Sequence, residues 1–254
     1  MSPPQGKLYL VPAPLDLGCS TQSTLEQVLP QATLETAQRL RYWICENAKS
    51  ARAYLKRVKQ ASPNSPPLQE LLIQQLPHAV HKKGDHAGGF DAKPLLAPAL
   101  AGHDMGLLSE AGMPAVADPG ASVVRAAHDL GLAVVPLVGP VSILLALAAS
   151  GLSGQSFAFV GYLPKEAEAR TQRIRELEAL ALRTGQTQLF IETPYRNTVL
   201  LQSLLQTLRA DTRLSVAVGL TLPDGTIRSE KIQTWRKNPS VEHSDAPMVF
   251  ALGP

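Results

Sequence analysis

The segment from residue 109 to residue 120 carries the residue types best suited to hold a polar ligand. It reads Ser-Glu-Ala-Gly-Met-Pro-Ala-Val-Ala-Asp-Pro-Gly and is dominated by small residues and proline. Small residues let backbone amides and carbonyls approach a ligand closely. Glu110 and Asp118 add two carboxylates that can accept a proton. On spacing alone, an ordinary turn between a strand and a helix is the alternative interpretation of this loop.

The segments on either side of this loop predict a βαβ unit. Residues 105–109 form an apolar run typical of a buried strand. A helix is expected to begin with Asp118 as its N-cap and Pro119 at its first position, and an apolar strand follows at residues 133–138. Ligands of open α/β sheets bind at the carboxyl ends of the strands. The loop is therefore the first place to expect a site.

Polar residues follow three other expected strands. Glu46 follows a strand at 42–45, Ser142 follows the strand at 133–138, and Glu192 follows a strand at 187–191. Each has a structural alternative. Ser142 is equally suited to cap the next helix, Glu192 to pair with Arg196, and Glu46 to be a solvated loop carboxylate.

Known chemical motifs are otherwise missing from the sequence. It contains neither GxGxxG nor GxxxxGK[ST], so dinucleotide and P-loop binding lack support. Leu107 stands where a nucleophile elbow around Ser109 needs glycine. Cys19 and Cys45 do not form a CxxC pair. No metal site is predicted, because the segment that carries most of the candidate ligands is rich in glycine; those candidates are His78, His81, His86, His103, Asp85 and Asp91.

The composition and the order of elements predict an α/β protein. Of the 254 residues, 44% are hydrophobic and 5% aromatic, as expected for buried parallel strands rich in Leu, Ala and Val. No apolar run is long enough to span a bilayer, so we expect a cytoplasmic protein without membrane contact. Strands and helices alternate in the first part of the chain, whereas the second ends in consecutive strands. We predict two α/β domains, residues 1–150 and 151–254.

Several helices and strands are expected from hydrophobic periodicity. The expected helices span residues 34–40, 49–60, 68–76, 94–101, 141–150, 166–183 and 196–209. The remaining expected strands span residues 7–11, 157–160, 214–221, 226–234 and 248–252.

One face of the expected 49–60 helix is basic. Lys49, Arg52, Lys56 and Lys59 lie opposite its apolar stripe. Lys and Arg are the residues that contact phosphate backbones, so RNA is a candidate partner. The alternative is a basic face that is simply solvated.

Four segments together resemble the tetrapyrrole methylase superfamily of S-adenosylmethionine-dependent methyltransferases, and within it the ribosomal RNA small subunit methyltransferase I family. The family's Ser-Asp-Ala-Gly-Thr-Pro and Asp-Pro-Gly correspond to residues 109–114 and 118–120. Its Gly-Pro segment corresponds to residues 139–147. Its Gly-Phe-Leu-Pro and Tyr-Glu-Ser-x-His-Arg elements correspond to residues 161–164 and 191–196.

This resemblance implies two α/β domains with a cofactor cleft between them, a homodimer, and S-adenosyl-L-methionine as cofactor. The cofactor contacts it implies are Ser109, Glu110, Ala111, Gly112, Pro114, Ser142, Ile143, Leu163, Glu192 and Thr193. The implied reaction is methylation of a ribose 2′-hydroxyl in ribosomal RNA. Glu46 and Asp118 are the candidates for handling the acceptor's proton, and Lys49 and Arg196 for orienting phosphate.

The chain departs from the family pattern in two places. The family's Thr-Pro-Ile-Gly-Asn-Leu-Gly-Asp is Ala-Pro-Leu-Asp-Leu-Gly at residues 13–18. Its Glu-Asp-Thr-Arg is Glu-Asn-Ala-Lys at residues 46–49. Lysine does not reproduce the planar, bidentate grip of arginine on phosphate. Two alternatives therefore stay open: a methyltransferase acting on a tetrapyrrole or another small molecule, and a non-catalytic RNA-binding module.

Overall fold

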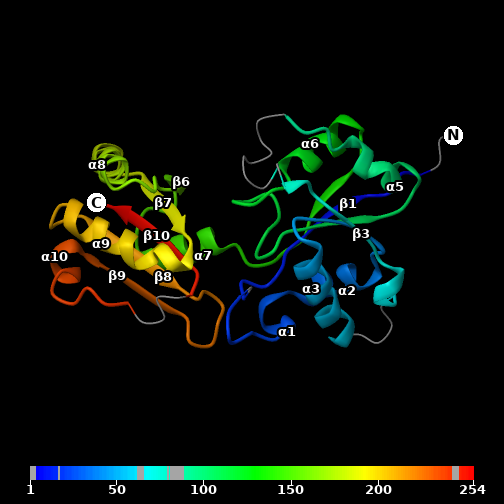
Figure 1. Ribbon diagram of the computed structural model, residues 1–254, viewed down its shortest axis with the longest axis horizontal. Helices are drawn as coiled ribbons and strands as arrows, with labels where there is room; N and C mark the ends of the chain where they lie inside the picture. Colours follow the sequence, from blue (N-terminus) through cyan, green and yellow to red (C-terminus); the bar gives the residue numbers. More distant parts are fainter. Residues whose placement is uncertain (1–3, 17, 62–65, 79, 81–88, 242–245) are drawn as a thin grey trace. The chain divides into compact units, whose positions relative to one another are not determined.

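The chain forms two compact units in a computed structural model, residues 1–141 and 142–254 (Figure 1). The structure describes residues 4–16, 18–61, 66–78, 80, 89–241 and 246–254. Each unit has its own five-stranded sheet. The expected α/β class with two domains therefore agrees with the observed elements.

The first unit is built on a parallel sheet. Its strands are β1 (Leu8–Val11), β2 (Tyr42–Cys45), β3 (Leu72–Gln75), β4 (Met105–Leu108) and β5 (Val134–Pro136), in the order β3-β2-β4-β1-β5. Val11 and Cys45 are both in register with Leu108. The last residues of β1, β2 and β4 therefore lie at one edge of the sheet, and so do the loops that follow them.

Helices and short 3₁₀ turns accompany this sheet. They are α1 (Leu25–Val28), α2 (Gln31–Arg39), α3 (Ala48–Ala61), η1 (Leu68–Glu70), η2 (Lys93–Leu96), α5 (Ala97–Leu100) and α6 (Ala121–Asp129). The apolar stripe of α3, which includes Ala51, Tyr54, Leu55 and Val58, packs in one core with Trp43 and residues of α1 and α2. A second core joins Met105 and Leu107 to residues of η2, α5 and α6. The helical period seen in the sequence is thus the one that buries α3.

The second unit is built on a mixed sheet. Its elements are α7 (Ser142–Ser150), β6 (Phe157–Tyr162), α8 (Ala167–Thr184), β7 (Thr187–Glu192), η3 (Pro194–Arg196), α9 (Asn197–Thr207), β8 (Arg213–Val218), β9 (Thr226–Lys231), α10 (Ile232–Trp235) and β10 (Met248–Gly253). The strand order is β6-β7-β10-β8-β9, and β6 and β7 are the parallel pair. Residues of α8, α9 and α10 share one core with the sheet, and residues of α7 share another.

The boundary between the units lies one helix earlier than expected. We predicted a division after residue 150, and the structure divides the chain between Val141 and Ser142. The reason is that α7 packs on the second sheet, where Ile143 and Leu147 contact the core residues Leu189 and Val249. Gly139-Pro140, which precedes α7, stays with the first unit.

Three predicted elements were wrong in type or extent. The helix expected at 68–76 is a single 3₁₀ turn followed by β3, because pairing with β2 fixes this segment as an edge strand. The strand expected at 226–234 ends at Lys231, where α10 begins. Asp118 is not the N-cap of α6. That position belongs to Gly120, whose φ of 140° few other residues adopt.

Within the described residues, no helix is long and apolar enough to cross a membrane.

The close pairing of β2 and β4 predicts a stability effect at Gly106. A Cβ at this position would lie 2.5 Å from Cε3 and Cζ3 of Trp43, a fully buried ring. Gly106→Ala should lower the free energy of unfolding by about 1–3 kcal/mol, because the packed core must shift. The measurement is urea denaturation. Gly89→Ala is the control, since an added Cβ there meets nothing within 4 Å; equal losses in both variants would contradict the packing argument.

Candidate functional site

The loops after β1 and β4 are joined by backbone hydrogen bonds. The amide of Ala13 donates to the carbonyl of Gly112 at 2.9 Å, and the amide of Gly112 donates to the carbonyl of Ala13 at 3.0 Å. These bonds hold the 109–120 loop over the carboxyl end of β1. The loop thus lies where ligands of parallel sheets bind.

The backbone of this loop is strained. Ala115 and Ala117 have φ values of 65° and 64°, and Gly112 and Gly120 have φ values of 72° and 140°. Left-handed conformations cost energy in residues with a Cβ, and they persist only where the surroundings fix them. Such strain concentrates at ligand-binding segments. It is the structural feature that most separates this loop from an ordinary turn.

Three predicted carboxylates gather at the carboxyl ends of β2 and β4. Burial, together with the charges of Glu46 and Glu110, raises the pKa of Asp118 to about 7. The nearby Ser109 hydroxyl lowers this pKa and only partly offsets the rise. Near neutral pH, Asp118 therefore exchanges a proton readily.

Ser50 and Cys45 lie beside these carboxylates and interact with Glu110. Ser50 of α3 donates its hydroxyl proton to Glu110 at 2.9 Å, so Glu110 ties the loop to α3. Burial, opposed by the nearby Arg52 and supported by the charges of Glu110 and Glu46, raises the pKa of Cys45 to about 11. Cys45 is therefore a protonated thiol at neutral pH and not a nucleophile.

The second unit holds the other predicted site residues. Glu192, at the carboxyl end of β7, forms an ion pair with Arg196 at 2.8 Å. Its other carboxylate oxygen accepts from the amide of Thr193 at 2.8 Å. The alternative interpretation of Glu192 as a partner of Arg196 is thus confirmed, and its cofactor contact stays a prediction.

The remaining predicted cofactor residues of this unit differ in how deeply they are buried. Ser142 is half-buried and is the first residue of α7. Ile143 and Leu163 are 4% and 3% exposed and belong to the hydrophobic cores. Their side chains are therefore already packed, and a ligand would reach these residues mainly through the backbone.

Sequence reasoning missed one interaction beside the first-unit loop. Arg57 of α3 and the buried Asp16 form a bidentate ion pair, with both N–O distances at 3.0 Å. Arg57 lies off the basic face of α3, on which Lys49, Arg52 and Lys56 are exposed and Lys59 is half-buried. The only available signal was an acidic residue in a proline-rich loop, which does not identify its partner.

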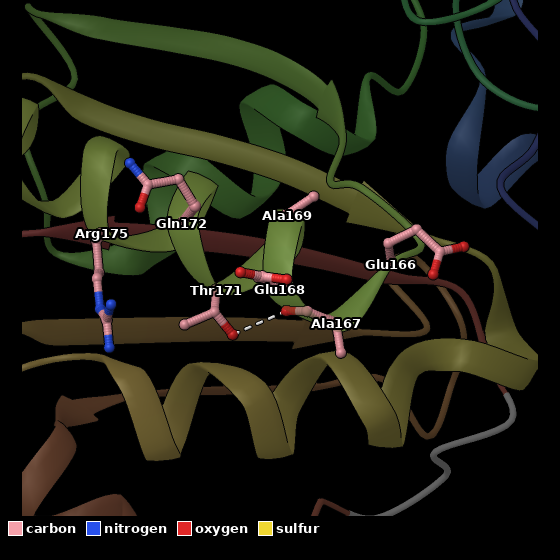
Figure 2. Close-up of a pocket in the computed structure, with 7 residues that line it drawn as sticks. All are labelled: Glu166, Ala167, Glu168, Ala169, Thr171, Gln172 and Arg175. Carbon is pink, nitrogen blue, oxygen red and sulfur yellow. Dashed lines mark hydrogen bonds between the residues drawn. The ribbon is translucent and has the colours of Figure 1, made fainter.

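Two hollows are also present: one borders the 109–120 loop, and the other lies apart from the predicted site residues. A volume of about 630 Å³ next to α6 is mostly apolar, and its walls include Met113 and Pro114 of the loop. Figure 2 shows the second, on α8, lined by residues from Glu166 to Arg175. There Thr171 donates its hydroxyl proton to the carbonyl of Ala167 at 2.9 Å, and none of the predicted site residues takes part.

The metal candidates divide between described and undescribed segments. His81, Asp85 and His86 lie outside the described residues. Among the residues that the structure does describe, no three His, Cys, Asp or Glu side chains are grouped as metal ligands would be.

Comparison with known proteins places these features in a family. The sequence profile described as Tetrapyrrole (Corrin/Porphyrin) Methylases matches residues 30–235. A Mesorhizobium japonicum protein named ribosomal RNA small subunit methyltransferase I is 31% identical over 232 residues, which are 89% of this chain and 69% of that protein. The Vibrio cholerae protein of the same name is 34% identical over 154 residues, 59% of this chain and 52% of that protein. The chain thus spans between about half and two thirds of these relatives.

Solved structures share the fold. A uroporphyrin-III-C-methyltransferase from Thermus thermophilus superposes with a TM-score of 0.55 at 19% identity, covering 98% of this chain and 94% of that one. The methyltransferase CobJ superposes with a TM-score of 0.58 at 17% identity and the same coverage. The profile match extends over most of the residues, and it confirms the resemblance inferred from the motifs. The chain belongs to the tetrapyrrole (corrin/porphyrin) methylase family.

Proposed function

We propose that this protein transfers a methyl group from S-adenosyl-L-methionine to ribosomal RNA. The observation that carries the proposal is the strained 109–120 loop, fixed beside three carboxylates in the segment that matches the family's signature. Family membership and relatives named as ribosomal RNA methyltransferases support it. The proposed acceptor is a ribose 2′-hydroxyl.

The loop fits the proposed cofactor in its chemistry. S-adenosyl-L-methionine carries positive charge on its sulfonium and its ammonium group, and when bound it supplies an activated methyl group. Glu46, Glu110 and Asp118 bring negative potential to the loop. The small residues Ala111 and Gly112 leave the backbone open to a ligand. The proposed contacts in the first unit are Ser109, Glu110, Ala111, Gly112 and Pro114. Those in the second are Ser142, Ile143, Leu163, Glu192 and Thr193.

The protein's main task in such a reaction is positioning. The sulfonium is a good leaving group, so a rate gain comes from holding the acceptor in line with the methyl group. We propose that Asp118 takes the proton that the acceptor hydroxyl loses, because a base with a pKa near the working pH is effective in this role. Glu46 keeps the pKa of Asp118 high and is the second candidate for proton transfer.

The basic face of α3 is the proposed RNA contact. Lys49, Arg52 and Lys56 are exposed there, and α3 also bonds to the loop through Ser50 and Glu110. Arg196 is proposed to orient phosphate, although most of its guanidinium is buried in the pair with Glu192. A homodimer and a cytoplasmic location are also proposed, on the family resemblance.

Donor binding and transfer test the function directly. Purified protein should bind S-adenosyl-L-methionine in calorimetry and transfer label from the tritiated cofactor to small ribosomal subunit RNA. Gly112→Ala should weaken donor binding about tenfold or more, because the added Cβ meets Leu15 at 3.1 Å and the φ of 72° becomes strained. Gly131→Ala is the matched control, with a φ of 71° and open space around it.

The outcome also decides between acceptors. Label that survives nuclease treatment would show a small-molecule acceptor. Salt-dependent RNA binding without any transfer would show a non-catalytic module. A wild-type protein that does not bind the donor would overturn the proposal.

The pH dependence of the rate tests the role of Asp118. Because only the deprotonated carboxylate accepts a proton, kcat/KM should rise with pH and level off above a pKa of about 7. Asp118→Asn should lower kcat/KM by roughly 10²–10⁴ and remove this rise. Asp211→Asn, which alters an exposed carboxylate, should leave the profile unchanged. An Asp118→Asn profile that keeps the rise would exclude Asp118 as the base.

Stability gives an independent measure of the same group. Between its ordinary pKa of 3.8 and its folded pKa of about 7, Asp118 holds a proton in the folded state and has lost it in the unfolded state. The free energy of unfolding that Asp118 contributes therefore falls as the pH rises through this window. Between pH 4 and pH 8, the free energy of unfolding of Asp118→Asn should therefore fall by about 1–3 kcal/mol less than that of the wild-type protein. Chemical denaturation at several pH values measures it, and identical slopes in both proteins would contradict the raised pKa.

A further inference from the structure

We propose that Asp16 and Arg57 are positioning residues for the 109–120 loop. Their ion pair fixes residues 12–16, and these residues in turn hold Gly112 in its left-handed conformation. The expected consequence, a weaker affinity for the methyl donor when the pair is lost, rests on the proposed function. Its structural part concerns the loop alone and is tested without any ligand.

The ion pair is built for a fixed geometry. Both guanidinium nitrogens of Arg57 reach the two carboxylate oxygens of Asp16, each at 3.0 Å. The same guanidinium donates to the carbonyl of Ser23 at 2.7 Å. The side chains of Arg57 and Asp16 are only 22% and 6% exposed. A bidentate pair of this kind fixes orientation as well as distance, and removing one partner leaves a buried charge without compensation.

Helix α3 holds the segment after β1 at both ends. At one end, the hydroxyl of Tyr54 donates to the carbonyl of Pro12 at 3.3 Å. At the other end, Arg57, three residues after Tyr54 on the same helix, forms the ion pair with Asp16. The segment between these two contacts contains Ala13 and Leu15. It is short, so fixing its ends leaves it little conformational freedom.

Ala13 and Leu15 carry this restraint to the loop. Ala13 exchanges two backbone hydrogen bonds with Gly112. Leu15 covers the same residue, since a Cβ built on Gly112 would lie 3.1 Å from Leu15 Cδ2. The strained backbone at Ala115 and Ala117, which follows Gly112 in the loop, persists only if its surroundings determine it. In this structure, the segment anchored by Asp16 supplies those surroundings on one side.

Loss of the ion pair should therefore change the population of the loop's conformations. If the binding-competent loop is present in only a fraction of the molecules, the apparent Kd for the donor rises by the inverse of that fraction. Bound donor selects the competent loop again, so kcat at saturating donor changes little. A residue that only stabilised the fold would lower the melting temperature and leave the Kd of the folded protein unchanged.

The first experiment measures amide hydrogen exchange in the ligand-free protein. Asp16→Asn keeps the shape of the side chain and removes its charge. It should speed exchange at Gly112 about tenfold, while Glu176→Gln, which breaks the exposed Arg173–Glu176 pair of the second unit, should not. Leu15→Ala leaves the ion pair intact and should speed exchange at the same amide. Exchange at Gly112 that is unchanged in both Asp16→Asn and Leu15→Ala would overturn the proposal.

The second experiment measures donor binding by calorimetry. Asp16→Asn should raise the Kd for S-adenosyl-L-methionine about tenfold with kcat within about twofold of the wild type. Asp16→Glu should recover part of the affinity, because it restores the charge. If Asp16→Asn does not fold, Arg57→Lys, which keeps the charge and loses the bidentate geometry, replaces it. If the folded Asp16→Asn variant binds the donor with the same Kd as the wild-type protein, the positioning role is overturned. If the wild-type protein itself does not bind the donor, the proposed function is overturned and the hydrogen-exchange result stays valid.

Discussion

The parallel register of β1, β2 and β4 is the constraint on which the candidate site depends. Because Val11, Cys45 and Leu108 end their strands at one edge, three loops that are far apart in sequence begin side by side. The backbone bonds between Ala13 and Gly112 and the bond from Ser50 to Glu110 are possible only in this register. A shift by one residue would turn each strand's buried side chains to the opposite face.

The same edge concentrates negative charge that the sheet does not neutralise by itself. Glu46, Glu110 and Asp118 come from the ends of two adjacent strands, and their mutual repulsion adds to the effect of burial on Asp118. A fold selected for stability alone has no need to bring three carboxylates together, because like charges that lie close to one another repel. Groups of this kind are typical of functional sites. The strained backbone in the same loop leads to the same conclusion by an independent route.

Local patterns predicted the elements, whereas long-range pairing decided the details. The stripe on α3 and the apolar run of β4 were visible in sequence because each depends on residues a few positions apart. The helix expected at 68–76 was wrong because a neighbouring strand overrode its local pattern. Asp118 was taken for a helix cap because Pro119 suits a first helical position, whereas α6 begins only at Ala121, after Gly120. The Asp16–Arg57 pair, 41 residues apart, left no periodic signal.

The two departures from the family pattern acquire physical meaning in this structure. Asn47 accepts from the amide of Lys49 at 2.9 Å and so caps α3, a role that Asp and Asn perform equally well. The exchange therefore preserves the helix and removes one negative charge beside Glu46. Asp16, in the other altered segment, is buried against Arg57. Both departures concern how the neighbouring loops are supported and charged. They bear on the acceptor more than on the donor, since none of the residues proposed to hold the donor lies in the altered segments.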